Sequence, residues 1–287
     1  MYQIIFNPTA GKKKATKGLQ TVCAMLKARG VAYQVHQTAE ARDAEKIARR
    51  LTRAGASHLI VLGGDGTLHE VLNGIENPAR CKLGLVPLGT GNDFAEAMGL
   101  PMDTKQAVQL ILDGDAKPVD YLRVGNRRCM NVAGFGMDVE VLERCHRGKL
   151  KGKIKYLMSL VQCVFSYKGC ALTVENEGQT RECNALLAAV CNGSQFGGGI
   201  RICPVADIAD GKIDVVTVDC IGGVFKLLGA FIALLKGKIL QYPKTTHFLC
   251  DKVRFVPKKP CTVQLDGELY ENLEMEASVG HGLKMYR

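Results

Sequence analysis

Short apolar runs alternate with longer amphipathic segments from the first residue to Pro118. The apolar runs at residues 2–6, 32–37, 58–62 and 83–86 predict strands, and the segments 16–29, 41–54 and 68–72 predict helices. In the first of these helices Leu19, Val22 and Leu26 share one face, and Gly30 stands where a glycine commonly ends a helix. Strands and helices in this alternation predict an α/β domain with a mostly parallel sheet.

The pattern changes beyond Pro118 to pairs of strands. Gly125-Asn126 separates the apolar runs 121–124 and 127–132, which is a typical two-residue hairpin turn. Further strands are predicted at residues 172–175, 183–190, 213–218, 252–256 and 262–265, with helices at 153–164 and 223–235. We therefore expect a β-rich sandwich as a second, C-terminal domain.

Composition and charge narrow the class of partner. A chain of 287 residues with 47% hydrophobic and 23% charged residues is typical of a folded protein with two domains. Its 38 Lys and Arg against 28 Asp and Glu give a net charge of +10, which favours phosphates or an acidic membrane as partners. Aromatic residues make up only 6%, with no Trp, so stacking on bases is disfavoured and we expect no nucleic acid partner.

The twelve cysteines are spread thinly through apolar stretches, with no CxxC pair and no Cys/His cluster in the sequence. They are typical of buried free thiols in a reducing cytosol. Residues 1–7 have no charged segment before a long apolar one, so they predict a strand and not a signal peptide. The apolar run 221–235 is shorter than the ~20 residues that span a bilayer and contains Lys226. We expect a cytoplasmic protein without a transmembrane helix.

Glycine-rich turns follow three of the predicted strands. The strand at 58–62 leads into GGDGTLHE at 63–70, the strand at 83–86 leads into LGTGNDF at 88–94, and the first strand leads into NPTAG at 7–11. Glycines let backbone amides approach a phosphate, and a following helix adds the positive end of its dipole. Loops at successive strand ends face one crevice, where Asp65 is placed to hold Mg²⁺. An ordinary turn capped by Asp65 and a solvated face for lysines 12–14 remain the alternatives.

The absence of other motifs excludes the commonest nucleotide-binding classes. The sequence has no GxxxxGK(S/T), no GxGxxG after a strand and no HRD catalytic loop. The sequence therefore lacks the phosphate-binding motifs that characterise P-loop proteins, dinucleotide-binding folds and protein kinases.

GGDGTLHEVLNG at 63–74 and PLGTGNDFA at 87–95 closely resemble the diacylglycerol kinase catalytic domain, in its bacterial soluble lipid kinase branch. The resemblance extends over the whole chain. It implies an ATP-binding α/β domain at 1–118, completed by about 276–287, and a β-rich lipid-substrate domain at 119–275, with the nucleotide cleft between them. Asp65 is implied to act on the phosphate and the magnesium. The ATP-binding residues that the resemblance implies are Asn7, Pro8, Thr9, Ala10, Gly11, Thr38, Gly63, Gly64, Asp65, Gly66, Thr67, Leu68, His69, Glu70, Thr90, Gly91, Asn92, Asp93 and Asp120.

Two further matches lie in the second domain. Asp207, Asp210 and the carbonyl of Lys212 resemble the family's structural magnesium segment, although the residues alone also fit an Asp-Gly turn. In QLDGE at 264–268, Glu268 matches the family's general base. Without the resemblance, the same residues would be interpreted as a hairpin turn with two solvated acids.

The sequence is thus identified as an ATP- and Mg²⁺-dependent lipid kinase of phospholipid biosynthesis, which most simply converts diacylglycerol to phosphatidic acid. An NAD kinase-like enzyme and a catalytically silent lipid or nucleotide sensor are the alternatives, and a homodimer stays open. The apolar segment 223–235 and a group of basic residues could hold the protein transiently at the inner face of the membrane, or could be solvated surface. The basic residues are Arg144, Arg147, Lys149, Lys151, Lys153 and Lys155.

Overall fold

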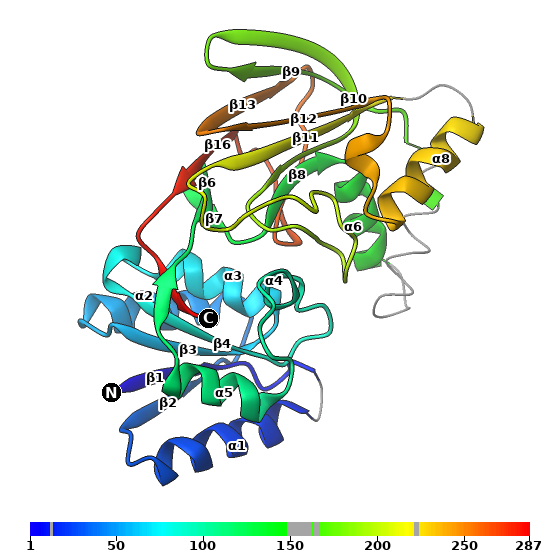
Figure 1. The fold of residues 1–287 in the computed structure, drawn as a ribbon. Coiled ribbons are helices and arrows are strands. Elements are labelled where there is room, and N and C mark those ends of the chain that lie inside the picture. Colours follow the sequence, from blue (N-terminus) through cyan, green and yellow to red (C-terminus); the bar gives the residue numbers. More distant parts are fainter. Residues whose placement is uncertain (12–13, 148–161, 164–166, 221–223) are drawn as a thin grey trace. The chain divides into compact units, whose positions relative to one another are not determined.

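The computed structural model describes residues 1–11, 14–147, 162–163, 167–220 and 224–287. The chain divides into two compact units, Met1–Asp120 with His281–Arg287, and Tyr121–Gly280 (Figure 1). The chain therefore leaves the first unit once and returns to it with its last residues.

The sheet of the first unit has the strand order β2-β1-β3-β4-β17-β5. Strands β2, β1, β3, β4 and β17 are parallel, and β5 is antiparallel to β17. Their bounds are β1 Tyr2–Phe6, β2 Tyr33–Gln37, β3 His58–Gly63, β4 Lys82–Pro87, β5 Ala116–Pro118 and β17 Lys284–Tyr286. Continuous apolar runs in β1 and β3 are buried on both faces, as a parallel sheet covered by helices requires.

The described residues of the first unit form five helices: α1 Lys14–Ala28, α2 Asp43–Arg53, α3 Asp65–Gly74, α4 Asp93–Ala97 and α5 Thr104–Asp113. A 3₁₀ turn at Pro78–Arg80 precedes β4. Helices α1 and α5 cover one face and α2 and α3 the other (Figure 1). Val22 and Leu26 of α1 are fully buried, as its apolar periodicity predicts.

The second unit is built on an antiparallel sheet in the order β15-β14-β8-β10-β9-β13-β16-β6-β7, with β11 paired to β10 and β12 paired to β11. The strand bounds are β6 Tyr121–Val124, β7 Arg127–Cys129, β8 Val132–Gly136, β9 Cys170–Asn176, β10 Gln179–Cys191, β11 Ile213–Asp219, β12 Thr245–Cys250, β13 Lys252–Pro257, β14 Val263–Leu265, β15 Glu268–Tyr270 and β16 Met275–Gly280. The helices are α6 Met137–Arg147 and α8 Val224–Leu235, with a 3₁₀ turn at Ile239–Gln241. Phe135 and Phe255 meet edge to face in its core, with ring centroids 5.5 Å apart.

The predicted fold class is confirmed: a mostly parallel α/β unit is combined with an antiparallel β-rich sandwich. One local prediction is wrong, and another is not tested. The run 127–132 is not one strand, because β7 ends at Cys129 and β8 begins at Val132 in another part of the sheet. The predicted helix 153–164 lies outside the described residues except for residues 162 and 163.

No helix among the described residues is long and apolar enough to cross a membrane. The cysteines whose side chains the structure describes are all free thiols.

Candidate functional site

Three loops meet at the carboxyl edge of the parallel sheet. They follow β1, β3 and β4, which are neighbours in the sheet, so their carboxyl ends lie side by side. The side-chain amide of Asn7 donates to Thr67 Oγ1 at 3.1 Å, which links the first loop to the second. The amide of Leu88 donates to the carbonyl of Gly63 at 2.8 Å, which links the second loop to the third. The structure thus brings the three glycine turns together.

Glycine is required where the loops touch, because no side chain fits between them. A Cβ built on Gly89 would lie 2.6 Å from the Cα of Gly64, and one built on Gly64 would lie 2.9 Å from the Cα of Gly89. Gly11 has a positive φ of 57°, and a Cβ there would collide with the carbonyl oxygen of Leu88. The close contact leaves backbone, not side chains, at this edge, which is the kind of surface that binds phosphate.

Asp65 opens α3 directly after Gly64, and its Oδ1 accepts a hydrogen bond from the amide of Phe94 at 3.2 Å. Its Oδ2 lies 3.1 Å from the Cβ position of Gly91, and Asp93 Oδ2 lies 3.5 Å from the same point. Two carboxylates therefore face one position beside the glycine loops. They are hard oxygen ligands that suit Mg²⁺, and without a cation they would repel a phosphate at this place. The donor set fits a magnesium ion.

The remaining predicted residues of the first loop and Thr38 lie at the same edge. Asn7 Oδ1 accepts hydrogen bonds from Thr9 N at 3.0 Å and Thr9 Oγ1 at 2.8 Å, so the side chain fixes the turn that includes Pro8 and Ala10. The amide of Thr38 donates to the carbonyl of Phe6 at 2.9 Å, directly beside the end of β1. Lysines 12 and 13 lie outside the described residues.

Three side chains predicted to contact ATP instead make contacts within the first unit. Leu68 is buried in the core, and His69 is buried and hydrogen-bonded to Asn73. Glu70 accepts hydrogen bonds from the backbone amides of Arg42 and Ala44, at 2.9 and 3.1 Å, and so caps the start of α2. Their positions are a consequence of the helical turn, because only the first residues of α3 face the loops.

Asp120 is not brought to the glycine loops. It follows β5, which runs antiparallel to β17, so the end of β5 pairs with the beginning of β17. The beginning of β17 in turn pairs with the beginning of β4. This is the edge opposite the loops. Asp120 is only 7% exposed, and its Oδ1 lies 2.7 Å from Nδ1 of His281. The pair joins the two segments by which the chain leaves and re-enters the first unit.

In the second unit, Glu268 is presented by a rigid hairpin. Asp266 and Gly267 both have positive φ, 53° and 90°, as a two-residue turn between β14 and β15 requires. The carboxylate of Asp266 accepts hydrogen bonds from the amides of Met130 and Asn131, at 2.8 and 2.7 Å. These bonds take residues 130–131 out of the strand ladder, which is why the run 127–132 breaks. Glu268 itself is exposed at the start of β15.

Cys129 also belongs to this anchor, since its thiol donates to Asp266 Oδ1 at 3.1 Å. Burial, together with the Asp266 carboxylate, raises the pKa of the Cys129 thiol well above its ordinary value. It therefore remains a neutral hydrogen-bond donor. Sequence reasoning missed the role of Asp266, because its partners lie more than 130 positions away.

The segment predicted to hold magnesium forms two exposed turns. Asp207 Oδ1 accepts from the amide of Ala209 at 3.0 Å, and Asp210 Oδ1 accepts from the amide of Lys212 at 2.9 Å. The side chain of Lys212 pairs with Asp251 at 2.7 Å. Carboxylate and carbonyl oxygens are ligands that Mg²⁺ accepts, so the residues fit the predicted ion.

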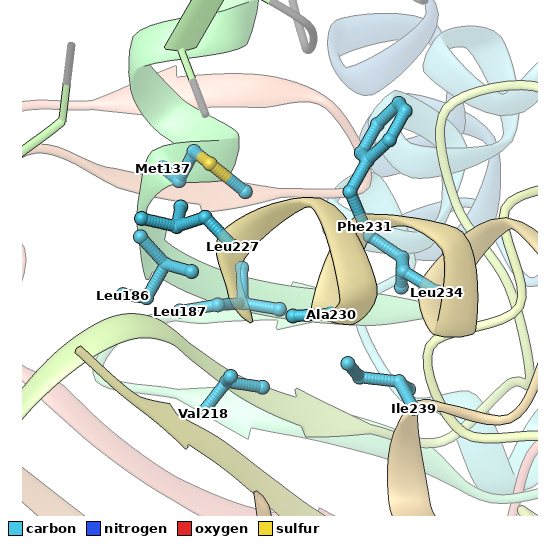
Figure 2. Close-up of a pocket in the computed structure, with 9 residues that line it drawn as sticks. All are labelled: Met137, Leu186, Leu187, Val218, Leu227, Ala230, Phe231, Leu234 and Ile239. Atoms are coloured by element: carbon cyan, nitrogen blue, oxygen red, sulfur yellow. The ribbon is translucent and has the colours of Figure 1, made fainter. Parts of the chain in front are cut away.

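Helix α8 covers an apolar pocket of the second unit (Figure 2). Helix α8 supplies one wall, and α6, β10, β11 and the 3₁₀ turn after α8 supply the others. The lining residues are Met137, Leu186, Leu187, Val218, Leu227, Ala230, Phe231, Leu234 and Ile239. The other face of α8 is also apolar, with Leu228, Ile232 and Leu235 exposed by 41, 43 and 46%. A helix that is apolar on both faces has more apolar surface than this unit buries.

Asp138, next to the pocket residue Met137, is a second acid that sequence reasoning missed. It stands in the first turn of α6 and is almost completely buried. Its Oδ2 would lie 2.7 Å from a Cβ on Gly134, so a glycine in β8 makes room for it. Burial raises the pKa of Asp138 to about 6. The carboxyl group therefore takes up a proton at mildly acidic pH.

Comparisons with known proteins agree with this architecture. Residues 1–124 match the family described as "Diacylglycerol kinase catalytic domain", and residues 131–283 match the "YegS C-terminal NAD kinase beta sandwich-like domain". A diacylglycerol kinase of Staphylococcus carnosus is 30% identical over 93% of this chain and 88% of its own length. A Xanthomonas oryzae protein named "Probable lipid kinase YegS-like" is 32% identical over 93% of this chain and 89% of its own length.

The fold has also been seen in solved structures. A crystal structure of a diacylglycerol kinase from Bacillus anthracis superimposes with a TM-score of 0.78 at 23% identity, and the match covers 99% of this chain and 96% of that one. Such a likeness supports the fold, and the sequence matches over both units establish the relationship. The chain belongs to the family of the diacylglycerol kinases and YegS-like lipid kinases.

Proposed function

We propose that this protein transfers the γ-phosphoryl group of Mg²⁺-bound ATP to the hydroxyl group of diacylglycerol, which yields phosphatidic acid. One observation carries the proposal: the carboxylates of Asp65 and Asp93 face one point beside Gly91, at loops whose backbones touch. Phosphoryl transfer depends on positioning and charge neutralisation more than on covalent chemistry. Closely packed backbone amides and a pair of metal-binding acids supply both.

The glycine loops bind the phosphates in this proposal. Helix α3 begins at Asp65, so the positive end of its dipole lies at the glycine loops. Asp65 and Asp93 would hold the Mg²⁺. When bound, the ion neutralises charge on the phosphate oxygens, and the two residues orient it through their carboxylates.

Glu268 activates the acceptor. The lipid oxygen attacks the γ-phosphorus, the bond from that phosphorus to the ADP oxygen breaks, and the hydroxyl proton passes to the carboxylate of Glu268. An exposed carboxylate on a hairpin anchored by Asp266 is suited to this task, because it is accessible while its backbone is fixed. Glu268 thus acts on the lipid, whereas Asp65 acts on the nucleotide.

The apolar surface around α8 supports a lipid acceptor. The pocket beneath α8 is apolar but too small for an acyl chain, so the exposed face of α8 is the surface that acyl chains can contact (Figure 2). Fully burying an aliphatic side chain contributes about 1.5–3 kcal/mol. Because Leu228, Ile232 and Leu235 are less than half exposed, each would contribute roughly 1 kcal/mol on entering a membrane. This is enough for transient adsorption, which brings the enzyme to a membrane-embedded hydroxyl without anchoring it.

The basic residues predicted to assist adsorption are only partly described. Arg144 pairs with Glu140 at 2.9 Å, which offsets its charge toward an anionic surface. Residues 149–155 lie outside the described part of the chain, as does the side chain of Arg147. The proposal therefore places membrane contact on α8.

A panel of acceptors in mixed micelles tests the proposal. ATP consumption and the phosphorylated product are measured with diacylglycerol, phosphatidylglycerol, a sphingoid base, a polyprenol and NAD, each with and without Mg²⁺. We expect Mg²⁺-dependent product with diacylglycerol at the highest kcat/KM. Phosphorylation of NAD would favour an NAD kinase-like enzyme, and no product with any acceptor would favour a sensor.

A further inference from the structure

Three potential metal ligands from distant parts of the second unit converge within its described residues. The sulfur of Cys203, a carboxylate oxygen of Asp214 and a ring nitrogen of His247 all lie within 4.8 Å of one another. Asp214 Oδ1 is 2.6 Å from His247 Nε2, and Cys203 Sγ is 3.9 Å from the same nitrogen. Cys203 is fully buried and Asp214 is 3% exposed, whereas the His247 side chain is 22% exposed.

The strand register places these groups together. Asp214 of β11 pairs with Leu249 of β12, and His247 is two residues from Leu249, so both polar side chains project from the same face of the sheet. Cys203 comes from the connection between β10 and β11, where its amide donates to the carbonyl of Ser194 at 3.1 Å. The ligands are far apart in sequence, which is why the sequence shows no Cys/His cluster.

The geometry differs from that of a catalytic relay. In a Cys–His–Asp arrangement the nucleophile and the acid contact opposite nitrogens of the imidazole ring. Here Cys203 and Asp214 both approach Nε2 of His247. Convergence on a single nitrogen is expected when the three groups share one ion, because each ligand points its lone pair at the metal.

A second cysteine lies near the three ligands. Cys191 of β10 is fully buried and lies directly opposite Asp214 in the antiparallel ladder, so its side chain is on the same face. Its sulfur is not one of the three atoms that lie within 4.8 Å of one another. The group itself therefore offers one sulfur, one imidazole and one carboxylate, which are ligand types that zinc sites use.

We propose that Cys203, Asp214 and His247 form a structural Zn²⁺ site. A buried carboxylate among apolar neighbours is costly unless its charge is compensated, and a divalent cation would supply that compensation. The ion would join β11 and β12 to the connection that carries Asp207 and Asp210. Because its ligands come from three segments of the second unit, the ion would stabilise this unit.

The full-length protein is first stripped of metal with a chelator and then titrated with Zn²⁺ or Co²⁺. We expect one tightly bound equivalent of Zn²⁺, a rise in Tm, and, with Co²⁺, the intense absorption of tetrahedral thiolate coordination. Absence of a stoichiometric equivalent in the wild-type protein would overturn the proposal and leave a buried Asp–His pair.

Variants locate the site. Cys203→Ser and His247→Gln should each weaken Zn²⁺ binding at least ~10-fold and lose the cobalt absorption. Cys220→Ser and His281→Gln, which change a cysteine and a histidine outside the cluster, should bind as the wild type does. If Cys203→Ser does not fold, His247→Gln decides, because that side chain is partly exposed. Unchanged metal binding in folded His247→Gln would refute the assignment.

Discussion

Substituting Gly89 with alanine tests the contact between the second and third loops. The new Cβ would lie 2.6 Å from the Cα of Gly64, whereas ordinary contact begins at 3.4 Å, so the loops must separate by about 0.8 Å. The Cβ would meet two atoms, Gly64 Cα and Asn92 Oδ1. Neither can move away easily, because the first belongs to the backbone and the second accepts a hydrogen bond from the amide of Gly89. Overpacking of this kind costs about 1–3 kcal/mol.

The same displacement should affect catalysis more strongly than stability. A misplacement of about 1 Å in a group that positions a reacting phosphate costs roughly 10²-fold in rate. We therefore expect Gly89→Ala to lower kcat/KM for ATP by about that factor. The assay is phosphorylation of diacylglycerol at varied ATP, with Tm measured in parallel.

Gly84→Ala is the matched control. Gly84 lies in β4, the strand that leads into the loop of Gly89. A Cβ on Gly84 would meet Ile111 Cδ1 at 2.7 Å, which is the flexible end of a core side chain. Gly84→Ala should lower the free energy of unfolding by a similar amount and leave the loops in place. The reasoning is refuted if Gly89→Ala keeps nearly full activity, or if Gly84→Ala loses as much activity at the same change in Tm.

Four further outcomes are expected. Asp65→Asn keeps an oxygen acceptor for the amide at the start of α4 but loses the charge, so kcat should fall at least ~10² while Tm stays unchanged; wild-type turnover would contradict this. Glu268→Gln should lower kcat by about 10²–10⁴ with ATP affinity intact, and the exposed neighbour Glu271→Gln should not. Because the pKa of Asp138 is raised to about 6, the unfolding free energy should fall as pH rises from about 4 to about 6, by roughly 3 kcal/mol. Asp138→Asn should remove that loss and raise Tm at pH 7, and identical pH profiles of the two proteins would contradict it. Mg²⁺ added to metal-free protein should raise Tm in the wild type but not in Asp210→Ala, and equal responses would leave the segment as a turn.

The local parts of the fold were predictable from the sequence. Apolar runs that end in glycine turns are short-range signals, so β1, β3 and β4 and their loops follow from the pattern alone. The contact between Gly64 and Gly89 then results from the parallel arrangement of neighbouring strands.

Features that depend on long-range pairing were not predictable. The break after Cys129 is set by Asp266, and the placement of Asp120 is set by the antiparallel direction of β5. Similarly, Cys203 and His247 meet only because β11 pairs with both β10 and β12. Chain periodicity carries no information on such partners, since it reports burial and not which segment provides it.

The fate of the γ-phosphoryl group tests the central claim most directly. Protein is mixed with γ-labelled ATP and Mg²⁺ in micelles that contain diacylglycerol, and the label is followed in the lipid and aqueous fractions. The account predicts that the label appears in phosphatidic acid, one per ATP consumed, and that chelation of Mg²⁺ stops the transfer. Label that remains in ATP, or that is released only as inorganic phosphate, would contradict a diacylglycerol kinase.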